Sequence, residues 1–431
     1  MPTMMKNVSK KKTLAQILSA IPSKILKGIN KRKTRRTVAV VAAGGKGERL
    51  YPFSTLSRPK QFCEIGGIAL ITSATKRIID TGIVRPEDCF VFVCDENQRS
   101  KAYKCLKKLG VKLKHIIIYR DTLDYAGCML QIAYDLVEKF GYDRKTVAIN
   151  TPSDNYLTGE GVANCFERLV ESAYSNGPTI LGIGRDKPEE IMPYGNAIYE
   201  PFINSRNSFR VKEFKEKPGY EDAVDLLAQG NSAVNTGINA WTLGDIIDAY
   251  DIKNLGETGG LKTDELMNAF GDNLFMEVAG KDVDWDDLGS FDSIVSKLQA
   301  TPNHRNVSIG TVKRTGCLDS AFIAANDIIE IDAHDIEDEY VVANMDNDGL
   351  VILVFDPYYA QEVKNFARSC KEGINNIYAV KATGNKLIES PIKTYCGFLG
   401  INGNSVYVDE EPIENGTKYI VHIRAIKQAI A

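Results

Sequence analysis

One segment constrains the fold of this chain more than any other: a continuous apolar run, Thr37–Ala43, which breaks directly into glycines. Similar short runs rich in β-branched residues follow at Cys89–Cys94, His115–Tyr119 and Thr146–Ile149. Between the last two, apolar residues recur across 129–140 at the three- and four-residue intervals of a helix. Because strands here alternate with helices, we predict an α/β domain whose sheet is parallel and covered on both faces.

The pattern becomes less regular after about residue 178. Thr179–Gly184 is a further strand candidate, and Asn196–Tyr199 and Phe209–Phe214 are typical of antiparallel strands added to such a sheet. We therefore expect the α/β domain to cover residues 37–300 and to contain a mixed sheet.

The character of the chain changes again from about residue 301. Short apolar runs there are separated by Asn, Asp and Gly turns, and a single clear helical pattern follows at Pro357–Cys370. The runs are Ile328–Ile331, Tyr340–Ala343 and Leu350–Phe355. We predict a smaller, β-rich C-terminal domain over 301–431, which could mediate assembly into a homo-oligomer, cap the active site or bind an effector.

The formal net charge of −3 is the sum of two unlike parts. Residues 1–36 hold eleven Lys and Arg and no acidic residue, which leaves 42 basic and 56 acidic residues elsewhere, a balance of −14. An acidic body argues against a body-wide nucleic-acid surface, so we expect no nucleic-acid partner. The basic arm, residues 1–36, carries apolar residues at near-helical spacing from Leu14 to Ile29, interrupted by Pro22. It is typical of a membrane-surface or partner-binding segment, a transit peptide, or a solvated tail.

Cysteine usage and hydropathy favour a cytoplasmic protein. The nine cysteines are scattered and form no Cys-x-x-Cys pair, which fits a reducing compartment and thiols that act as small core residues. No stretch of about 18 apolar residues is present, so we expect no membrane-spanning helix. Peripheral contact with an anionic membrane through the basic arm remains an alternative.

The glycines after the first strand are the first candidate site. Backbone N–H groups of Ala43, Gly44, Gly45 and Gly47 can approach an anion closely where a parallel strand ends. The loop is neither a dinucleotide fingerprint, since Leu50 stands where the third glycine belongs, nor a P-loop, since Gly-Lys-Ser/Thr is absent. Arg49 and Lys60 add two cations that suit a bound polyphosphate.

Two carboxylates form the second candidate site. Asp154 follows the predicted strand at 146–149, and Asp287 lies far away in the sequence. Open α/β sheets bind ligands at the carboxyl ends of their strands, so the two side chains could meet there. Carboxylate oxygens suit Mg²⁺, which typically bridges protein carboxylates and substrate phosphates. For a single such Asp, a turn or a helix cap is the competing interpretation.

Six motifs over residues 37–300 resemble the sugar-1-phosphate nucleotidyltransferases, and the branch they resemble most is mannose-1-phosphate guanylyltransferase (GDP-mannose pyrophosphorylase). In family order they are GGKGERLYPFS…RPKQF (44–62), TPSDN (151–155), YGNAI (194–198), FKEKP (214–218), NTGI (235–238) and WDDLGSF (285–291). The resemblance implies a Rossmann-like, glycosyltransferase-A-like mixed sheet with a smaller β-rich C-terminal domain. It implies an enzyme that joins an NTP to a sugar 1-phosphate with Mg²⁺ and releases pyrophosphate.

The resemblance also implies roles for individual residues. The catalytic cations would be Arg49, Lys60 and Lys217, and the metal ligands would be Asp154 and Asp287. The nucleotide would contact Ala43, Gly44, Gly45, Gly47, Asp124 and Ala126. The sugar phosphate would contact Gly195, Glu216, Lys217 and Asn235. Because the attacking phosphate is already an anion, no general base is required, and catalysis would consist of positioning and charge stabilisation.

Several positions depart from the family pattern. The segment near the base usually reads Arg-Asn-Thr-Ala-Pro, whereas this chain has Leu-Asp-Tyr-Ala-Gly at 123–127. Thr55 stands in place of Arg, Asn155 and Asn196 in place of His and Tyr, and Phe291 in place of Trp. An ionised Asp124 accepts hydrogen bonds but donates none, and it could pair with guanine N1–H and N2–H. A cytidylyl-, uridylyl- or thymidylyltransferase and a catalytically weak regulatory subunit that binds nucleotide sugars stay open as alternatives.

Overall fold

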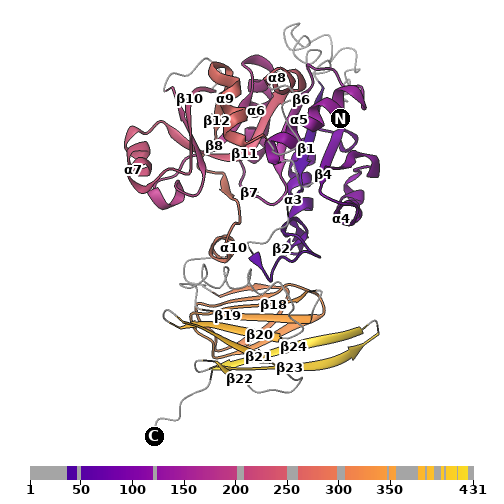
Figure 1. Cartoon of the computed structure of the whole chain (residues 1–431), viewed down its shortest axis with the longest axis vertical. Coiled ribbons are helices and arrows are strands. Elements are labelled where there is room, and N and C mark those ends of the chain that lie inside the picture. Colours follow the sequence, from indigo (N-terminus) through magenta and orange to yellow (C-terminus); the bar gives the residue numbers. More distant parts are fainter. Residues whose placement is uncertain are drawn as a thin grey trace, which may run out of the picture.

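The computed structural model shows an α/β domain stacked on a β-rich domain along the long axis of the molecule (Figure 1). Described are residues 36–45, 50–119, 124–200, 208–249, 261–298, 306–346, 349–355, 377–383, 386–392, 399–401, 404–414 and 416–425. The predicted helix at Pro357–Cys370, the amphipathic pattern of the basic arm, Gly47 and Arg49 lie outside these residues. Within them, no helix is long and apolar enough to cross a membrane.

The α/β domain is built on a nine-stranded sheet of order β5-β4-β1-β6-β11-β8-β12-β10-β9. The first four strands in this order are parallel to one another, which confirms the four strands predicted from the apolar runs. They are β1 (Thr37–Ala42), β4 (Cys89–Val93), β5 (Ile116–Ile118) and β6 (Val147–Pro152). Their carboxyl ends therefore lie at one edge of the sheet.

The other half of the sheet is mixed. There β11 runs antiparallel to β6 and β8, β12 runs parallel to β8, and β9 and β10 are antiparallel to each other, as predicted. These strands are β8 (Thr179–Ile183), β9 (Gly195–Tyr199), β10 (Phe209–Glu216), β11 (Ser232–Thr242) and β12 (Phe275–Val278).

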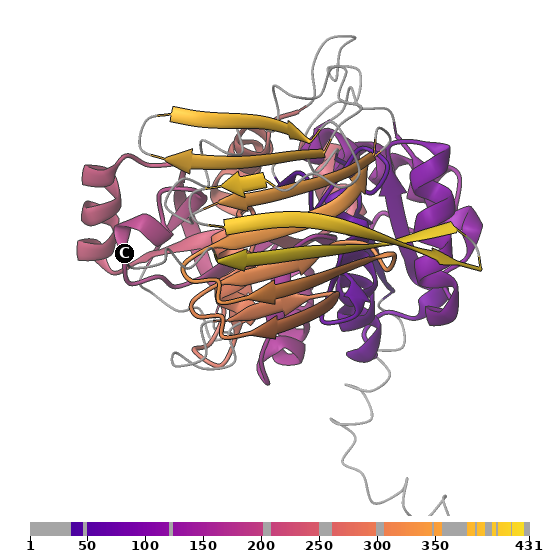
Figure 2. The same cartoon turned by 90° about the horizontal axis from the view of Figure 1, so that it is seen from below.

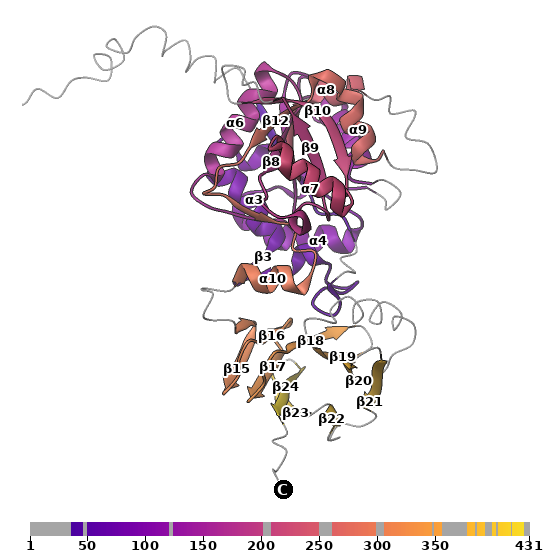
Figure 3. The ribbon, with the colours of Figure 1, turned by 90° about the vertical axis from the view of Figure 1, so that its left-hand side faces the viewer.

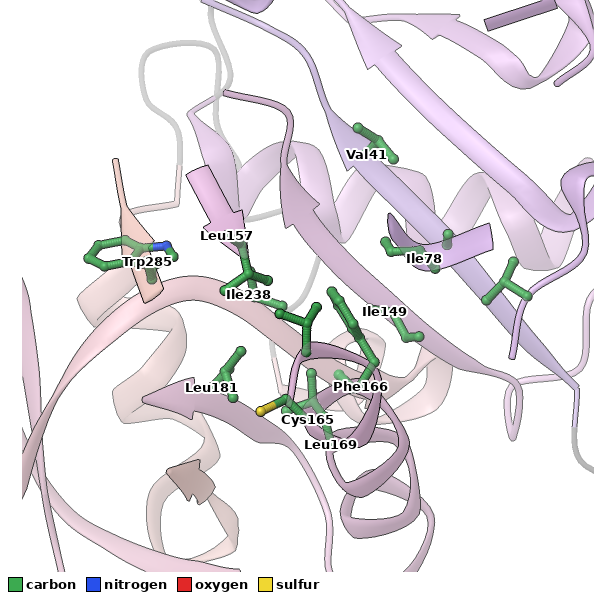
Figure 4. Close-up of a cluster of buried hydrophobic side chains, with 14 of the residues drawn as sticks. Val41, Ile78, Ile149, Leu157, Cys165, Phe166, Leu169, Leu181, Ile238 and Trp285 are labelled. Atoms are coloured by element: carbon green, nitrogen blue, oxygen red, sulfur yellow. The ribbon is translucent and has the colours of Figure 1, made fainter. Parts of the chain in front are cut away.

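Helices cover both faces of this sheet because β1 alternates its buried side chains between two cores. Ala39 and Val41 belong to the core under one set of helices, and Val38 and Val40 to the core under the other. The first set is α3 (Leu70–Asp80), α4 (Glu96–Leu106), α6 (Val162–Ser175) and α7 (Tyr220–Gln229). The second set is α5 (Tyr125–Glu138), α8 (Leu243–Ala249) and α9 (Thr263–Phe270). Figure 4 shows the first core, where Ile149 of the sheet lies near Phe166 of α6 and Val41 lies farther along the same face.

The C-terminal domain consists mainly of two stacked sheets, seen together from below in Figure 2. From β14 to β18, consecutive strands belong alternately to one sheet and to the other. The turns between them include Asp319 and Asp335, which adopt a positive φ. One sheet contains β14 (Val307–Ile309), β16 (Ala321–Ala324), β18 (Tyr340–Asp346) and β19 (Gly349–Phe355). The other contains β15 (Thr311–Thr315), β17 (Ile329–His334), β24 (Gly416–Ala425), β23 (Asn404–Ile413) and β22 (Leu399–Ile401). A separate hairpin pairs β20 (Ile377–Thr383) with β21 (Lys386–Ile392). The three predicted strands correspond to β17, β18 and β19.

A shared apolar cluster joins the two domains, with α10 (Phe291–Leu298) between them (Figure 3). Polar contacts reinforce it. The Asn344 side chain, which is buried, donates to the Pro52 carbonyl at 2.6 Å, and the Tyr340 hydroxyl donates to Asp292 at 2.9 Å. The Arg58 guanidinium donates to the carbonyl of Ala325. The C-terminal domain therefore holds the segment that leads to Lys60.

Candidate functional site

The glycine loop leaves β1 with its backbone exposed. Gly44 and Gly45 are both exposed, whereas Ala43 is buried and donates its N–H to the Phe92 carbonyl of β4 at 2.9 Å. The Gln61 side-chain amide donates to the Ala43 carbonyl at 2.7 Å, which ties the loop to the segment around Lys60. The Ala43 N–H is therefore held by the sheet and not by an anion as predicted, and the Gly45 N–H donates to Cys94 Sγ at 3.4 Å. An anion at the carboxyl end of β1 would have to displace this long bond to sulfur in order to use Gly45.

Asp124 and Ala126 lie at the start of α5. Asp124 is the N-cap of the helix, where its Oδ1 accepts the Gly127 N–H at 2.9 Å. Burial raises the pKa of Asp124, and nearby acidic residues raise it further. The bond from the Gly127 N–H lowers this pKa and so offsets part of the rise. Ala126 is fully buried. Asp124 therefore caps the helix, a role that was not predicted for it from the sequence.

Asp154 and Asp287 meet at Lys60. Asp154 follows β6, and Asp287 follows the short strand β13 (Asp284–Asp286). Lys60 Nζ lies 3.0 Å from Asp154 Oδ2 and donates to the Asp287 carbonyl oxygen at 2.5 Å. The Lys60 side chain is 6% exposed and that of Asp154 33% exposed. The structure therefore brings the Asp154 carboxylate and the backbone carbonyl of Asp287 to the cation that the sequence singled out. The ammonium group is paired and buried, whereas the sequence predicts a cation directed at phosphate.

The Asp287 carboxylate itself is held by two other donors. Its Oδ1 accepts the Gly289 N–H at 3.0 Å and the Tyr194 hydroxyl at 3.1 Å. Between Asp287 and Gly289 the backbone turns through Leu288, which has a φ of +49°. Burial raises the pKa of Tyr194, and the neighbouring carboxylates Asp287 and Asp286 raise it further, so the hydroxyl remains protonated and can act as a donor.

The predicted sugar-phosphate residues gather on β9, β10 and β11. Gly195 lies opposite Glu216 in the β9–β10 register, and a Cβ at Gly195 would lie 2.6 Å from Glu216 Oε2, so a side chain there would displace the Glu216 carboxylate. Lys217 has a φ of +47°, and its N–H donates to the Tyr194 carbonyl at 3.1 Å. Its side chain is 66% exposed, with Nζ 3.6 Å from Glu216 Oε1. Asn235 lies on β11, which pairs with β9, and its Oδ1 accepts the Gly237 N–H at 3.1 Å.

Comparison with known proteins decides the family. A family model described as "Nucleotidyl transferase" matches residues 38–304. This chain belongs to the nucleotidyl transferase family. The mixed α/β sheet with a β-rich C-terminal domain agrees with that membership.

Relatives within the family carry mannose-1-phosphate guanylyltransferase names. A protein of that name from Sinorhizobium fredii is 26% identical over 53% of this chain and 43% of its own length. Mannose-1-phosphate guanylyltransferase ManC from Salmonella typhimurium is 24% identical over 77% of this chain and 72% of its own length. The match thus spans less than half of the Sinorhizobium protein.

A solved structure supports the fold. The structure described as mannose-1-phosphate geranyltransferase from Thermus thermophilus aligns with a TM-score of 0.60 at 21% identity. The alignment covers 78% of this chain and 99% of that one. At this identity the likeness concerns the fold alone.

The positions that depart from the family pattern support the backbone of the site. Asn155 donates from its side chain to the Thr236 carbonyl at 2.9 Å, and Asn196 donates to the Tyr194 carbonyl at 2.8 Å. Both asparagines are buried. Their amides therefore fix strand ends, a role that requires a donor but not a ring.

Sequence reasoning missed two residues of this site, Tyr194 and Arg185. The Arg185 guanidinium donates to the Trp285 carbonyl at 2.6 Å and lies 5.9 Å from the centre of its indole ring. Arg185 comes two residues after β8 ends, so the signal that marked Asp154, a polar residue just beyond a strand, could have found it. Tyr194 lies inside a quoted motif, but spacing gives no indication that its hydroxyl reaches Asp287.

The carboxylate pair fits a hard divalent cation that is completed by substrate. No group of three or more His, Cys, Asp and Glu side chains in the described part of the chain could hold a metal by itself. Asp154 and Asp287 supply oxygen donors on two separate strand ends, and Mg²⁺ is commonly bound by one or two carboxylates together with waters and substrate phosphates. The donor set thus suits Mg²⁺ and not a preformed zinc site.

Proposed function

We propose that this chain transfers a nucleotidyl group from an NTP to a sugar 1-phosphate with Mg²⁺, and that its preferred substrates are GTP and mannose 1-phosphate. The observation that carries the proposal is the meeting of Asp154 and Asp287 at Lys60, beside the exposed glycines that end β1. The names of the relatives support the choice of nucleotide and sugar.

In the proposed reaction, an oxygen of the sugar phosphate attacks the α-phosphorus of the NTP in line. The bond from the α-phosphorus to the bridging oxygen breaks, pyrophosphate leaves, and a nucleoside-diphosphate sugar forms. Bound Mg²⁺, held by Asp154 and Asp287, would supply charge neutralisation at the phosphates. A cation directed at the developing charge contributes roughly 10²–10³-fold in rate.

The other residues of the site would bind the two substrates. Backbone N–H groups of Gly44 and Gly45 would bind the triphosphate, with Arg49 as a further cation expected from the sequence. Lys60 neutralises Asp154 and holds it beside the Asp287 backbone. On the other side, Lys217 would bind the sugar phosphate and Glu216 would accept hydrogen bonds from sugar hydroxyls. The deprotonated nucleophile needs no base, and none of these residues is assigned that role.

The test is a matrix of four NTPs against several sugar 1-phosphates, read as pyrophosphate release. We expect the highest turnover with GTP and mannose 1-phosphate. Turnover with CTP, UTP or dTTP in place of GTP would replace the guanylyl assignment with one of the three alternatives. Nucleotide-sugar binding without turnover for any pair would favour the regulatory subunit and refute the enzyme.

We also propose a cytoplasmic location in which the basic arm, residues 1–36, binds anionic membrane surfaces. Its eleven cations and lack of acidic residues support this, at about 1 kcal/mol per basic residue near such a surface. The full chain should sediment with vesicles that contain phosphatidylserine at low salt and be released at high salt. Equal sedimentation of a chain that starts at Thr37 would refute the role of the arm.

A further inference from the structure

Tyr194 contacts both halves of the site: the carboxylate half around Asp287, and the sugar-phosphate half around Lys217. It directly precedes Gly195 and β9, and its own N–H donates to the Ile191 carbonyl at 3.1 Å, which fixes the turn that it occupies. Its ring packs edge-on against the Trp285 indole, with 5.1 Å between ring centres and an angle of 68°. The ring is therefore held in place independently of its hydroxyl group.

The hydroxyl of Tyr194 serves the carboxylate half. It donates to Asp287 Oδ1 at 3.1 Å, the same oxygen that accepts the Gly289 N–H at 3.0 Å. Two donors on one oxygen restrict rotation of the carboxylate about its χ2 bond, because turning the group would break both bonds. Hydrogen bonds to a charged group are stronger than those between neutral groups, so the two donors together select one orientation of the carboxylate.

The carbonyl of Tyr194 serves the sugar-phosphate half. It accepts the Lys217 N–H at 3.1 Å and the Asn196 side-chain amide at 2.8 Å. The Lys217 bond matters because that residue has a φ of +47°, a conformation that a lysine keeps only when its surroundings impose it. Tyr194 thus fixes Lys217 through its backbone and Asp287 through its side chain.

We propose that Tyr194 is a positioning residue that orients Asp287 for a divalent cation and ties this orientation to Lys217, so that cation and sugar phosphate bind cooperatively. The inference rests on the proposed function for the identity of the two ligands. Tyr194 contacts neither ligand in this scheme and acts only through the residues that it holds. Outer-shell partners of this kind typically change metal affinity by about 10–100-fold when they are removed.

The first measurement is titration of the full chain with Mn²⁺ as a probe for the cation, with free Mn²⁺ read by electron paramagnetic resonance. Tyr194→Phe keeps the ring on Trp285 and removes only the hydroxyl, so we expect a melting temperature lowered by a few degrees at most and a Kd for Mn²⁺ about tenfold higher. The matched control is Tyr156→Phe, on the strand β7 (Tyr156–Thr158) that pairs with β13, which should change the Kd less than twofold. A Kd in Tyr194→Phe within twofold of the wild type would overturn the inference.

A double-substitution cycle separates positioning from general packing. If Tyr194 acts through Asp287, then Tyr194→Phe should add no further loss of Mn²⁺ affinity in a chain that already carries Asp287→Asn. A full tenfold loss in that background would show that the hydroxyl acts elsewhere and would overturn the proposal. This comparison does not depend on turnover.

Cooperativity gives the last measurement. Mannose 1-phosphate should lower the Kd for Mn²⁺ in the wild type and lower it less in Tyr194→Phe, because linkage is reciprocal. An equal effect in both proteins would overturn the link to Lys217. Failure of the proposed function is seen separately, as a substrate matrix without pyrophosphate release, while the Mn²⁺ titrations still report on Tyr194. A wild type that binds no Mn²⁺ would overturn the positioning role itself.

Discussion

The two lysines of this site are positioned in opposite ways. Lys60 has a 6% exposed side chain, and its ammonium group is fixed by Asp154 and by the carbonyl of Asp287. Lys217 has a 66% exposed side chain, and its position is set by a left-handed backbone held at Tyr194. Lys60 is thus part of the protein interior as well as of the site, whereas Lys217 can serve a ligand without supporting the fold. Substitutions on the two sides should therefore differ in kind.

The largest effect should come from the carboxylate that both sides share. Asp287→Asn removes a proposed metal ligand while its remaining oxygen can still accept from Gly289 and Tyr194, so we expect turnover to fall by about 10³-fold with little change in stability. Pyrophosphate release and the melting temperature check this. Asp284→Asn, on the strand β13 that precedes Asp287, is the charge-matched control, since Asp284 pairs with Lys297. Turnover near that of the control would refute the metal role.

A second comparison sets the two lysines against each other directly. Lys60→Met leaves Asp154 without its cation, and because that carboxylate is one-third exposed we expect a loss of stability of about 1–3 kcal/mol together with lost turnover. Lys217→Met should leave stability unchanged within about 0.5 kcal/mol and lower kcat/KM for the sugar phosphate by about 10–100-fold. Urea unfolding and steady-state kinetics provide the measurements. Equal stability of the two variants would contradict the contrast between the lysines.

Binding of the sugar phosphate can be weakened by a substitution that changes no charged residue. A methyl group at Gly195 would lie 2.5 Å from Phe214 Cζ and 2.6 Å from Glu216 Oε2, so Gly195→Ala must displace the Glu216 side chain. We expect the KM for the sugar 1-phosphate to rise about tenfold while the KM for the nucleotide stays the same. Gly219→Ala is the matched control, because a Cβ there meets nothing within 4 Å. A rise in both KM values would mean that the sheet itself had shifted.

The smallest effect on kinetics should come from a substitution outside the α/β domain. Asn344→Leu leaves the Pro52 carbonyl without its donor, which should cost about 1–3 kcal/mol of stability and raise the KM for the nucleotide about two- to fivefold. Asn231→Leu removes a similar bond, 2.9 Å to the Tyr199 carbonyl, on the sugar side. It should lower the melting temperature without changing the KM for the nucleotide. The same kinetics in both variants would argue against a C-terminal role in positioning the Lys60 segment.

The strands of the fold could be predicted because their signals are local. Continuous apolar runs such as that of β1 fill both cores, and strand-end carboxylates converge wherever a sheet gathers its carboxyl ends. The convergence of Asp154 and Asp287 follows from this rule. The antiparallel strands of the mixed half could be predicted too, but their order in the sheet depends on pairings between strands far apart in the sequence, which periodicity alone does not reveal.

The finer structure of the site could not be predicted in the same way. Lys60 and Asp154 are both charged residues in expected places, but only tertiary packing decides that they pair with each other rather than await a ligand. Asp124 caps α5, a local role that its place before an apolar helix could have indicated. The bond from Tyr194 to Asp287 joins residues 93 positions apart, and no pattern in either segment encodes it.

The contact between Asn344 and Pro52 has a consequence for synthesis of the chain on the ribosome. The two residues are 292 positions apart, so at about 5–20 residues per second the N-terminal partner waits on the order of 15–60 s for the other to be made. During that time the apolar side chains around Phe53 lack their C-terminal neighbours. Newly made α/β domains would therefore present this surface to chaperones until the last sheets are complete.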